Sequence, residues 1–389
     1  MIQRAVRKQP GMYPATRASG FGLVELMVSM AIGLVIIAAL VALFLGTSRN
    51  NREMATASSV IENGRFAIEL LEGDLVHAGF WGEWVPHFDD QTFQDLPDDA
   101  PTAVPDACLA YDPADWDAAY FRNLIGIPIQ VYEATDPALP CAALLANRVA
   151  DSDVLIVRHA DMCVPGVGNC EPDTNGKIYI QTNLCADATT DPTHVIGTDS
   201  GSFTLTQRNC LDTSAKRAFV SHIYYVRNYA ATPGDGIPTL VRSEFDLVGG
   251  TLSHQPPEPL IEGVESLRVE IGVDDRGRTN EAVNYAQPVI WVDPVTKEAA
   301  RNRGDGVPDG NFVRCTAADP CTADQLMNAT AARVYVLARS REATAGYTDT
   351  KSYILGQAGT VDAFDDGFKR HVYSSTVRLI NVSGRRERP

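Results

Sequence analysis

An almost wholly apolar run, residues 21–46, sets the first limit on how this chain can fold. Its segment 26–45 would make a helix about 30 Å long, which matches the hydrocarbon core of a bilayer. Glu25 lies near the front of the run, and the small pair Ser19-Gly20 directly precedes it. A carboxylate at the bilayer centre costs about 2.5–3.5 kcal/mol, and less near the interface. The sequence thus predicts a membrane helix that carries an acidic residue close to its start.

The helical pattern continues beyond the apolar run. Residues 47–78 contain no proline, and apolar residues recur at intervals of three, four and seven, as on one helical face: Met54, Ala57, Ile61, Ile68, Leu71 and Leu75. Gly79, Gly82 and Pro86 signal the end. We therefore expect one long helix with a membrane-soluble first half, residues 21–46, and an amphipathic second half within residues 47–85.

After Pro86 the composition changes, and residues 86–150 are expected to be loop because aspartate, proline and alanine dominate them. Short segments rich in β-forming residues follow, bounded by turn residues: 153–158, 177–181, 220–227, 239–245, 264–273, 333–338 and 372–380. The clearest is 264–273, where four apolar residues alternate with Arg268 and Glu270. The expected fold class is α+β, a long N-terminal helix packed on a mostly antiparallel β body formed by residues 86–389.

Charge limits the partners and sets the orientation. The net charge is -16, yet residues 1–20 contain four basic side chains and no acidic one. An acidic body repels phosphate backbones, so nucleic acid is an unsuitable partner. Basic residues that flank an apolar run stay on the cytoplasmic side, so the body should face outward. Arg385, Arg386 and Arg388 are expected to form a solvated terminus.

All eight cysteines follow the apolar run: Cys108, Cys141, Cys163, Cys170, Cys185, Cys210, Cys315 and Cys321. An even number in an outward-facing body predicts disulfides formed in an oxidising compartment, and large disulfide-bonded loops. No C-x-x-C pair is present to suggest zinc. Short loops favour Cys163–Cys170 and Cys315–Cys321. The pairs Cys108–Cys141 and Cys185–Cys210 are expected for the other four, although spacing alone does not fix them.

Catalytic and metal-binding patterns are weak. Asp199-Ser200-Gly201 lacks the flanking glycines of a serine-hydrolase loop, and scattered histidines such as His77 and His222 are expected to be structural. The aromatic residues Phe80, Trp81 and Trp84 are expected to pack at the end of the helix. The acidic loop offers oxygen ligands for Ca²⁺ from Asp305, Asp309 and Asn311, with Asp274 and Asp275 before it, but lacks the EF-hand spacing. A solvated turn is the alternative.

The start of the chain resembles the prepilin signal of type IV pilins and type II secretion pseudopilins. The shared features are a basic leader, here residues 1–20, a small residue at the cut, an aromatic first residue and glutamate at the fifth position of the mature chain. The resemblance implies cleavage after Gly20 by prepilin peptidase, methylation of the new amine of Phe21, and an assembly role for Glu25. This leader is longer than usual. An ordinary secretory signal fits poorly, because the small residues precede the apolar run.

Further segments resemble PilW-type minor pilins: residues 62–82, 264–275, 331–340 and 367–386. This resemblance implies a pilin-like fold and a non-enzymatic minor pilin in an inner-membrane complex that primes pilus assembly at the tip. The implied partners are other minor pilins, the major pilin and a tip adhesin, and the implied roles are twitching motility and adhesion, with no cofactor or small-molecule substrate. A type II secretion minor pseudopilin, a signal-anchored periplasmic hydrolase and a calcium-dependent adhesive module remain alternatives.

Overall fold

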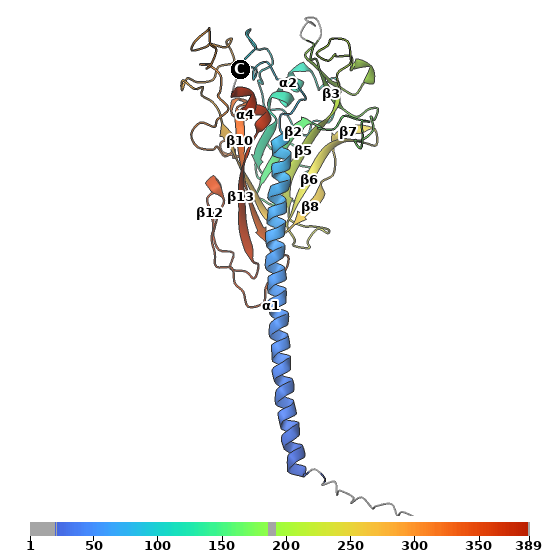
Figure 1. Ribbon diagram of the computed structural model, residues 1–389, viewed down its shortest axis with the longest axis vertical. Helices are drawn as coiled ribbons and strands as arrows, with labels where there is room; N and C mark the ends of the chain where they lie inside the picture. The colour runs from blue at the N-terminus through green and yellow to red at the C-terminus, as the bar shows by residue number, and fades with distance from the viewer. Residues whose placement is uncertain (1–19, 21, 186–191, 388–389) are drawn as a thin grey trace, which may run out of the picture. The chain divides into compact units, whose positions relative to one another are not determined.

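The computed structural model describes residues 20, 22–185 and 192–387. It contains two compact units, of which the first ends at Ala55 and the second begins at Thr56. Helix α1 (Leu23–His77) runs through both units without interruption over 55 residues (Figure 1). The predicted long N-terminal helix is therefore confirmed. It ends where Gly79 and Gly82 adopt positive φ angles of 74° and 79°, a backbone conformation that glycine allows.

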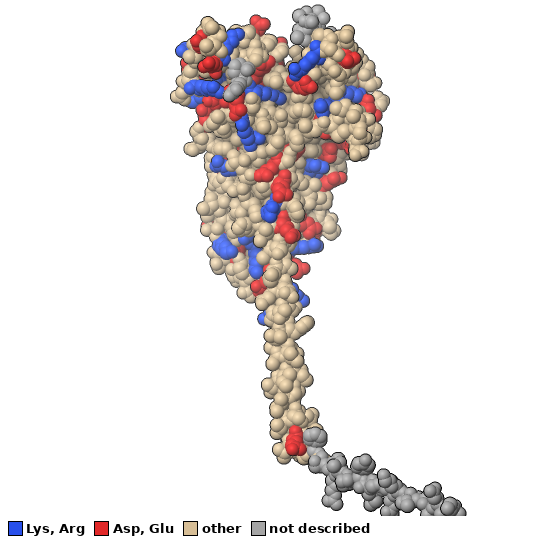
Figure 2. Space-filling model, in the orientation of Figure 1, with Lys and Arg blue, Asp and Glu red and all other residues tan. Residues whose placement is uncertain are grey.

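In the first unit, the apolar side chains of α1 are exposed along its whole length. Leu34 and Phe44, for example, are 66% and 71% exposed to solvent. Figure 2 shows this stretch of the helix as an almost uncharged surface. The helix is long and apolar enough to cross a membrane.

The second unit is a mostly antiparallel β body made of two main sheets (Figure 1). The larger sheet has eight strands: β1 (Ile129–Glu133), β2 (Asp153–Ala160), β3 (Tyr179–Thr182), β4 (His194–Gly197), β5 (Arg217–Arg227), β6 (Thr239–Val248), β7 (Thr251–His254) and β8 (Glu258–Glu262). The smaller sheet has the order β13-β10-β9, from β9 (Val264–Val273), β10 (Ala329–Arg339) and β13 (Arg370–Arg378). The paired strands are antiparallel, so the predicted α+β class is confirmed.

Helix α1 packs on this body through a face that includes the predicted Leu71 and Leu75 but not the predicted Ile61. Its buried residues are Val60, Gly64, Ala67, Leu71 and Leu75, whereas Ile61 is 50% exposed. The helix approaches the smaller sheet closely at Gly64, where an added Cβ would lie 2.1 Å from the ring of Tyr373. Small residues permit this close approach. A pattern of large apolar residues at helical spacing does not reveal such small contact residues. The same core contains Val269, Val334 and Val377 from the three strands of that sheet.

The stretch 86–150 contains regular structure that was predicted to be loop. Helix α2 (Ala118–Gly126) is capped at its N-terminus by Asp117, whose side chain accepts a hydrogen bond from the backbone N–H of Tyr120. Strand β1 follows, and every one of its residues pairs with β2. Both elements are short and lie among prolines and aspartates, which explains why composition alone favours loop.

Helix α4 (Ile380–Arg386) corrects two further predictions about the C-terminus. The closing strand β13 ends at Arg378, and Ile380 already belongs to this helix. Arg386 is not solvated but 3% exposed, and its side chain donates hydrogen bonds to Asp89 and Asp274. Arg385 contacts Asp89 as well, over 3.6 Å. Arg388 lies outside the described residues.

Short elements complete the body: η1 (Ser200–Ser202), α3 (Ala323–Met327), β11 (Tyr353–Ile354), η2 (Gly356–Ala358) and β12 (Thr360–Val361).

Four disulfides close loops in the body, and they join consecutive cysteines: Cys108–Cys141, Cys163–Cys170, Cys185–Cys210 and Cys315–Cys321. Cys163–Cys170 and Cys315–Cys321 are the pairs that short spacing favours, and the other two are the pairs expected for the remaining cysteines. Trp81 and Trp84 pack with Trp116 and Phe219 in a second core beside the turn that follows α1, as their positions predict.

Candidate assembly site

The start of α1 holds a carboxylate against the backbone. Glu25 Oε2 accepts a hydrogen bond from the backbone N–H of Gly22 over 3.0 Å, and Gly22 C=O accepts from Leu26 N–H over 3.1 Å. A carboxylate in the first helical turn also interacts favourably with the helix dipole. Gly20 is exposed, and Phe21 lies outside the described residues. The predicted cleavage site therefore directly precedes the point where Glu25 caps the helix.

The surface that follows Glu25 is apolar for several turns. Its exposed side chains include Leu26, Met27, Met30, Ile32, Leu34, Val35, Ile37, Leu40, Val41, Leu43 and Phe44. Such a surface is stable only in lipid or against other apolar surfaces, because water contact with so many adjacent apolar groups is unfavourable. The unit is thus built either to lie in a bilayer or to pack against similar helices.

In the acidic loop, two of the three candidate calcium ligands accept hydrogen bonds from the backbone. Asp305 Oδ1 accepts from the backbone N–H of Val307, and Asp309 Oδ2 accepts from that of Arg276. Asp274, at the end of β9, binds the backbone N–H groups of Asp305 and Gly306 and the side chain of Arg386. These carboxylates therefore hold the loop and the C-terminus in place, as expected for a turn stabilised by its own aspartates.

Asp199, Ser200 and Gly201 form a capped turn. Asp199 Oδ1 accepts from Gly201 N–H over 2.9 Å, at the start of η1. The backbone N–H next to the serine is thereby already bound by an aspartate, which is local turn chemistry of the Asx type.

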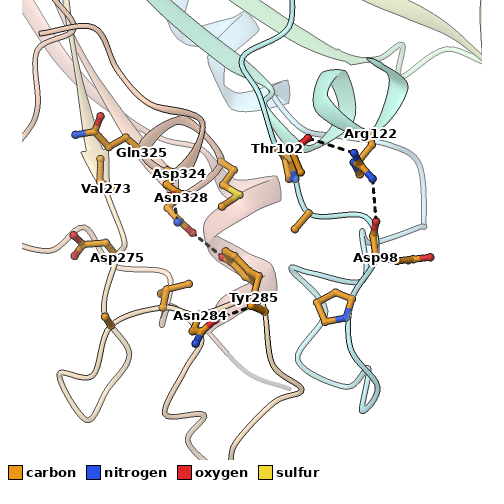
Figure 3. Close-up of a pocket in the computed structure, with 17 residues that line it drawn as sticks. Asp98, Thr102, Arg122, Val273, Asp275, Asn284, Tyr285, Asp324, Gln325 and Asn328 are labelled. Carbon is orange, nitrogen blue, oxygen red and sulfur yellow. Dashed lines mark hydrogen bonds between the residues drawn. The ribbon is translucent and has the colours of Figure 1, made fainter. Parts of the chain in front are cut away.

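A groove of roughly 650 Å³ lies between the loop before α2 and the loops after β9 (Figure 3). Arg122 contacts Thr102 and the carbonyl of Asp98 on one side, and Tyr285 donates to Asn328 on the other. Its 17 lining residues include no serine, cysteine or histidine. The residues that line this groove therefore do not form a Ser–His or Cys–His pair.

The structure also brings together a group of residues that the sequence does not reveal. Asp74 of α1 contacts His159 of β2 and His222 of β5, which lie 85 and 148 positions further along the chain. Burial disfavours the charge on Asp74, but the hydrogen bonds to both histidines outweigh it and hold its pKa well below the usual range. Burial likewise opposes the charge on His159, yet Asp74 raises the pKa of His159 above its ordinary value.

Comparison with known proteins gives two family matches. Residues 223–381 match the family model described as Type IV Pilus-assembly protein W, and residues 16–41 match the prokaryotic N-terminal methylation motif. A search of curated proteins returned no match. Among solved structures, the chain is similar to the type IV-like pilin TTHA1219 from Thermus thermophilus, with 13% sequence identity and a TM-score of 0.24. That similarity covers 60% of this chain and 80% of the other.

The two family matches cover the start of helix α1 and the C-terminal strands of the body. The methylation motif covers the residues around Gly20 and Glu25 and the first turns of α1. The assembly-protein match extends from within β5, through β9, β10 and β13, to the start of α4. Together with a long apolar helix at the start and a disulfide-bonded antiparallel body after it, the two family matches support a PilW-like type IV minor pilin.

Proposed function

We propose that this minor pilin is made with a leader, residues 1–20, which prepilin peptidase removes after Gly20, and that the new amine of Phe21 is then methylated. In the mature protein, residues 21–46 would be the membrane and assembly half of the helix and residues 47–85 its amphipathic half. Residues 86–389 would be the body. The match to the methylation motif and the basic leader support this division.

One observation carries the assembly mechanism: the Glu25 carboxylate lies 3.0 Å from the backbone nitrogen of Gly22. Gly22 directly follows Phe21, so cleavage creates a positive amine one residue from the group that Glu25 binds. Opposite charges attract strongly where water is scarce, so Glu25 can neutralise the amine of its own chain or that of a neighbouring subunit. This pairing lowers the penalty for keeping both charges in an apolar environment and sets the depth at which subunits join.

In this proposal the protein is anchored in the inner membrane with its body in the periplasm, and later stands at the pilus tip. The basic leader and the four disulfides support that orientation. The exposed apolar face of α1 packs against the helices of other minor pilins and of the major pilin, while the body contacts other minor pilins and a tip adhesin. The role is structural: it primes pilus assembly for twitching motility and adhesion, without catalysis, cofactor, nucleic acid or small-molecule substrate.

The decisive experiment combines processing with assembly. Mass spectrometry of the protein from cells with and without prepilin peptidase should find an N-terminus at methylated Phe21 only in the former. A Glu25→Gln variant should be processed but should reduce surface pili and twitching, whereas Glu69→Gln, an exposed acid further along the helix, should leave both unchanged. An unprocessed leader in cells with active peptidase contradicts the processing step. Normal pili with Glu25→Gln contradict the role of the carboxylate.

The same cells distinguish the pilus from a secretion pseudopilus. Cross-linking of the full-length protein in membranes, followed by identification of its neighbours, should recover minor pilins and the tip adhesin. Recovery of secretion-system subunits in their place would assign the protein to type II secretion.

A further inference from the structure

Three side chains from three separate elements converge inside the body. Asp74 lies near the end of α1, His159 on β2 and His222 on β5. Asp74 Oδ1 is 3.0 Å from His159 Nε2, and Asp74 Oδ2 is 3.0 Å from His222 Nδ1. Each side chain keeps only about a tenth of its surface, 10–11%. The three ligand-type atoms lie within 4.8 Å of one another.

Both ring nitrogens of His159 face hydrogen-bond acceptors. His159 Nδ1 lies 2.8 Å from the carbonyl oxygen of Ala160, which can only accept, so Nδ1 carries the proton of the neutral ring. Nε2 then presents its lone pair toward the Asp74 carboxylate, which is also an acceptor. Two facing lone pairs are stabilised only by a positive charge between them, and that charge is either a second proton or a metal ion.

His222 also turns one nitrogen toward Asp74, while its other nitrogen faces an acceptor at more than hydrogen-bonding distance. Its Nδ1 faces Asp74, while its Nε2 lies 4.0 Å from Glu244 Oε1 on β6. Both histidines therefore turn one nitrogen toward a shared carboxylate and the other toward an acceptor, a backbone carbonyl for His159 and a carboxylate for His222. Histidines that bind metal characteristically donate their second N–H to an acceptor, which fixes the tautomer and orients the ring, and His159 does so to Ala160.

The distances also fit a metal ion. Zinc binds nitrogen and carboxylate oxygen at about 2.0–2.2 Å in tetrahedral sites, which separates neighbouring ligand atoms by about 3.3 Å. The two measured nitrogen–oxygen separations of 3.0 Å are close to that edge length. Two imidazoles with one carboxylate favour zinc over calcium, which prefers six or more oxygen ligands.

We propose that Asp74, His159 Nε2 and His222 Nδ1 form a binding site for a zinc ion, with water as the fourth ligand. The site would fasten the last turns of α1 to β2 and β5, and so fix the end of the helix on the larger sheet. It does not depend on the assembly role of Glu25 or on the cleavage of the leader. Zinc would replace the extra proton that His159 otherwise needs to face Asp74.

The full-length protein in detergent, freed of metal with a chelator, tests this site. In competition with a chromophoric chelator it should take up one equivalent of zinc. His159→Gln and His222→Gln should each weaken binding more than about 100-fold, because loss of an outer partner alone already costs 10–100-fold. The control is His371→Gln, an exposed histidine on β13, which should bind zinc as the wild type does.

A second measurement does not depend on the stability of the variants. Cobalt(II) added to the metal-free wild-type protein should give the intense visible bands of a tetrahedral site, and one equivalent of zinc should abolish them. Absence of stoichiometric zinc binding would overturn the proposal and leave a protonated His159 paired with Asp74. The proposal is equally wrong if the cobalt bands are absent, or if folded His159 and His222 variants bind zinc as tightly as the control.

Discussion

Arg386 and Asp89 form a buried ion pair that joins the last helix to the loop after α1. Arg386 Nε donates to Asp89 Oδ1 over 2.6 Å, and each side chain keeps 2% of its surface. The same guanidinium donates to Asp274, Asn328 and the carbonyl of Met327. A basic residue three positions from the end of the chain is therefore a central structural group of the body.

Replacing this arginine should destabilise the body strongly. Arg386→Met leaves the buried carboxylates of Asp89 and Asp274 without their cation, so we expect a loss of about 3–5 kcal/mol in the free energy of unfolding. Denaturant unfolding followed by tryptophan fluorescence measures it. The control Arg341→Ala removes an exposed pair with Glu262 and should cost less than about 1 kcal/mol. Equal losses in the two variants would contradict the structural role of Arg386.

Two glycines of α1 should respond in opposite directions to the same substitution. Gly64→Ala places a methyl group 2.1 Å from the ring of Tyr373, so we expect destabilisation of about 1–3 kcal/mol. Nothing lies within 4 Å of an added Cβ at Gly73, and Gly73→Ala should stabilise the helix by about 0.5–1 kcal/mol. Unfolding midpoints of both variants decide this. Adding Tyr373→Val to Gly64→Ala should recover part of the loss, and no recovery would show that the contact is not limiting.

The disulfides should contribute according to the loops they close. Cys108–Cys141 spans 33 residues and Cys163–Cys170 spans seven. In the chain-entropy description, removing the first by double serine substitution costs about 4 kcal/mol and removing the second about 2 kcal/mol. Thermal unfolding of the two double variants, each with the other three disulfides intact, compares them. A larger loss from the short loop would mean that native packing around Cys163 and Cys170 outweighs chain entropy.

Acid should weaken the body through a buried neutral histidine. Burial lowers the pKa of His254 to about 3, and the charges of Arg158 and His222, which face it, act in the same direction. The unfolded chain takes up this proton near pH 6.5, so stability falls as pH drops below that value and stops falling near pH 3. From pH 7 to pH 5 the loss attributable to His254 is about 2 kcal/mol.

A His254→Gln variant should therefore lose less stability between pH 7 and pH 5 than the wild type does, whatever its stability at pH 7. His194→Gln is an independent check, because burial lowers the pKa of His194 to about 4. Denaturant titrations at both pH values measure the difference. Parallel losses in the wild type and both variants would exclude the two histidines as the cause.

Local patterns predicted the elements whose signal lies within a few neighbouring residues. The alternation in 264–273 corresponds to β9, and the unbroken apolar run corresponds to the first half of α1. On α1 the buried Leu71 and Leu75 were predicted, whereas Gly64 and Ala67 were missed because small residues allow close approach but bury little apolar surface. Asp74, His159 and His222 could not be grouped from sequence, since only the pairing of β2 with β5 beneath α1 brings them together.

The order of the cysteines has a consequence for how the body is made. Each of the four pairs joins one cysteine to the next along the chain, so no loop encloses or crosses another. Read from the N-terminus, both cysteines of each pair therefore precede the first cysteine of the next pair. Oxidation in that order gives the native connectivity directly, and none of the other pairings has to be undone. The native disulfides can thus form segment by segment, in the order of the cysteines along the chain.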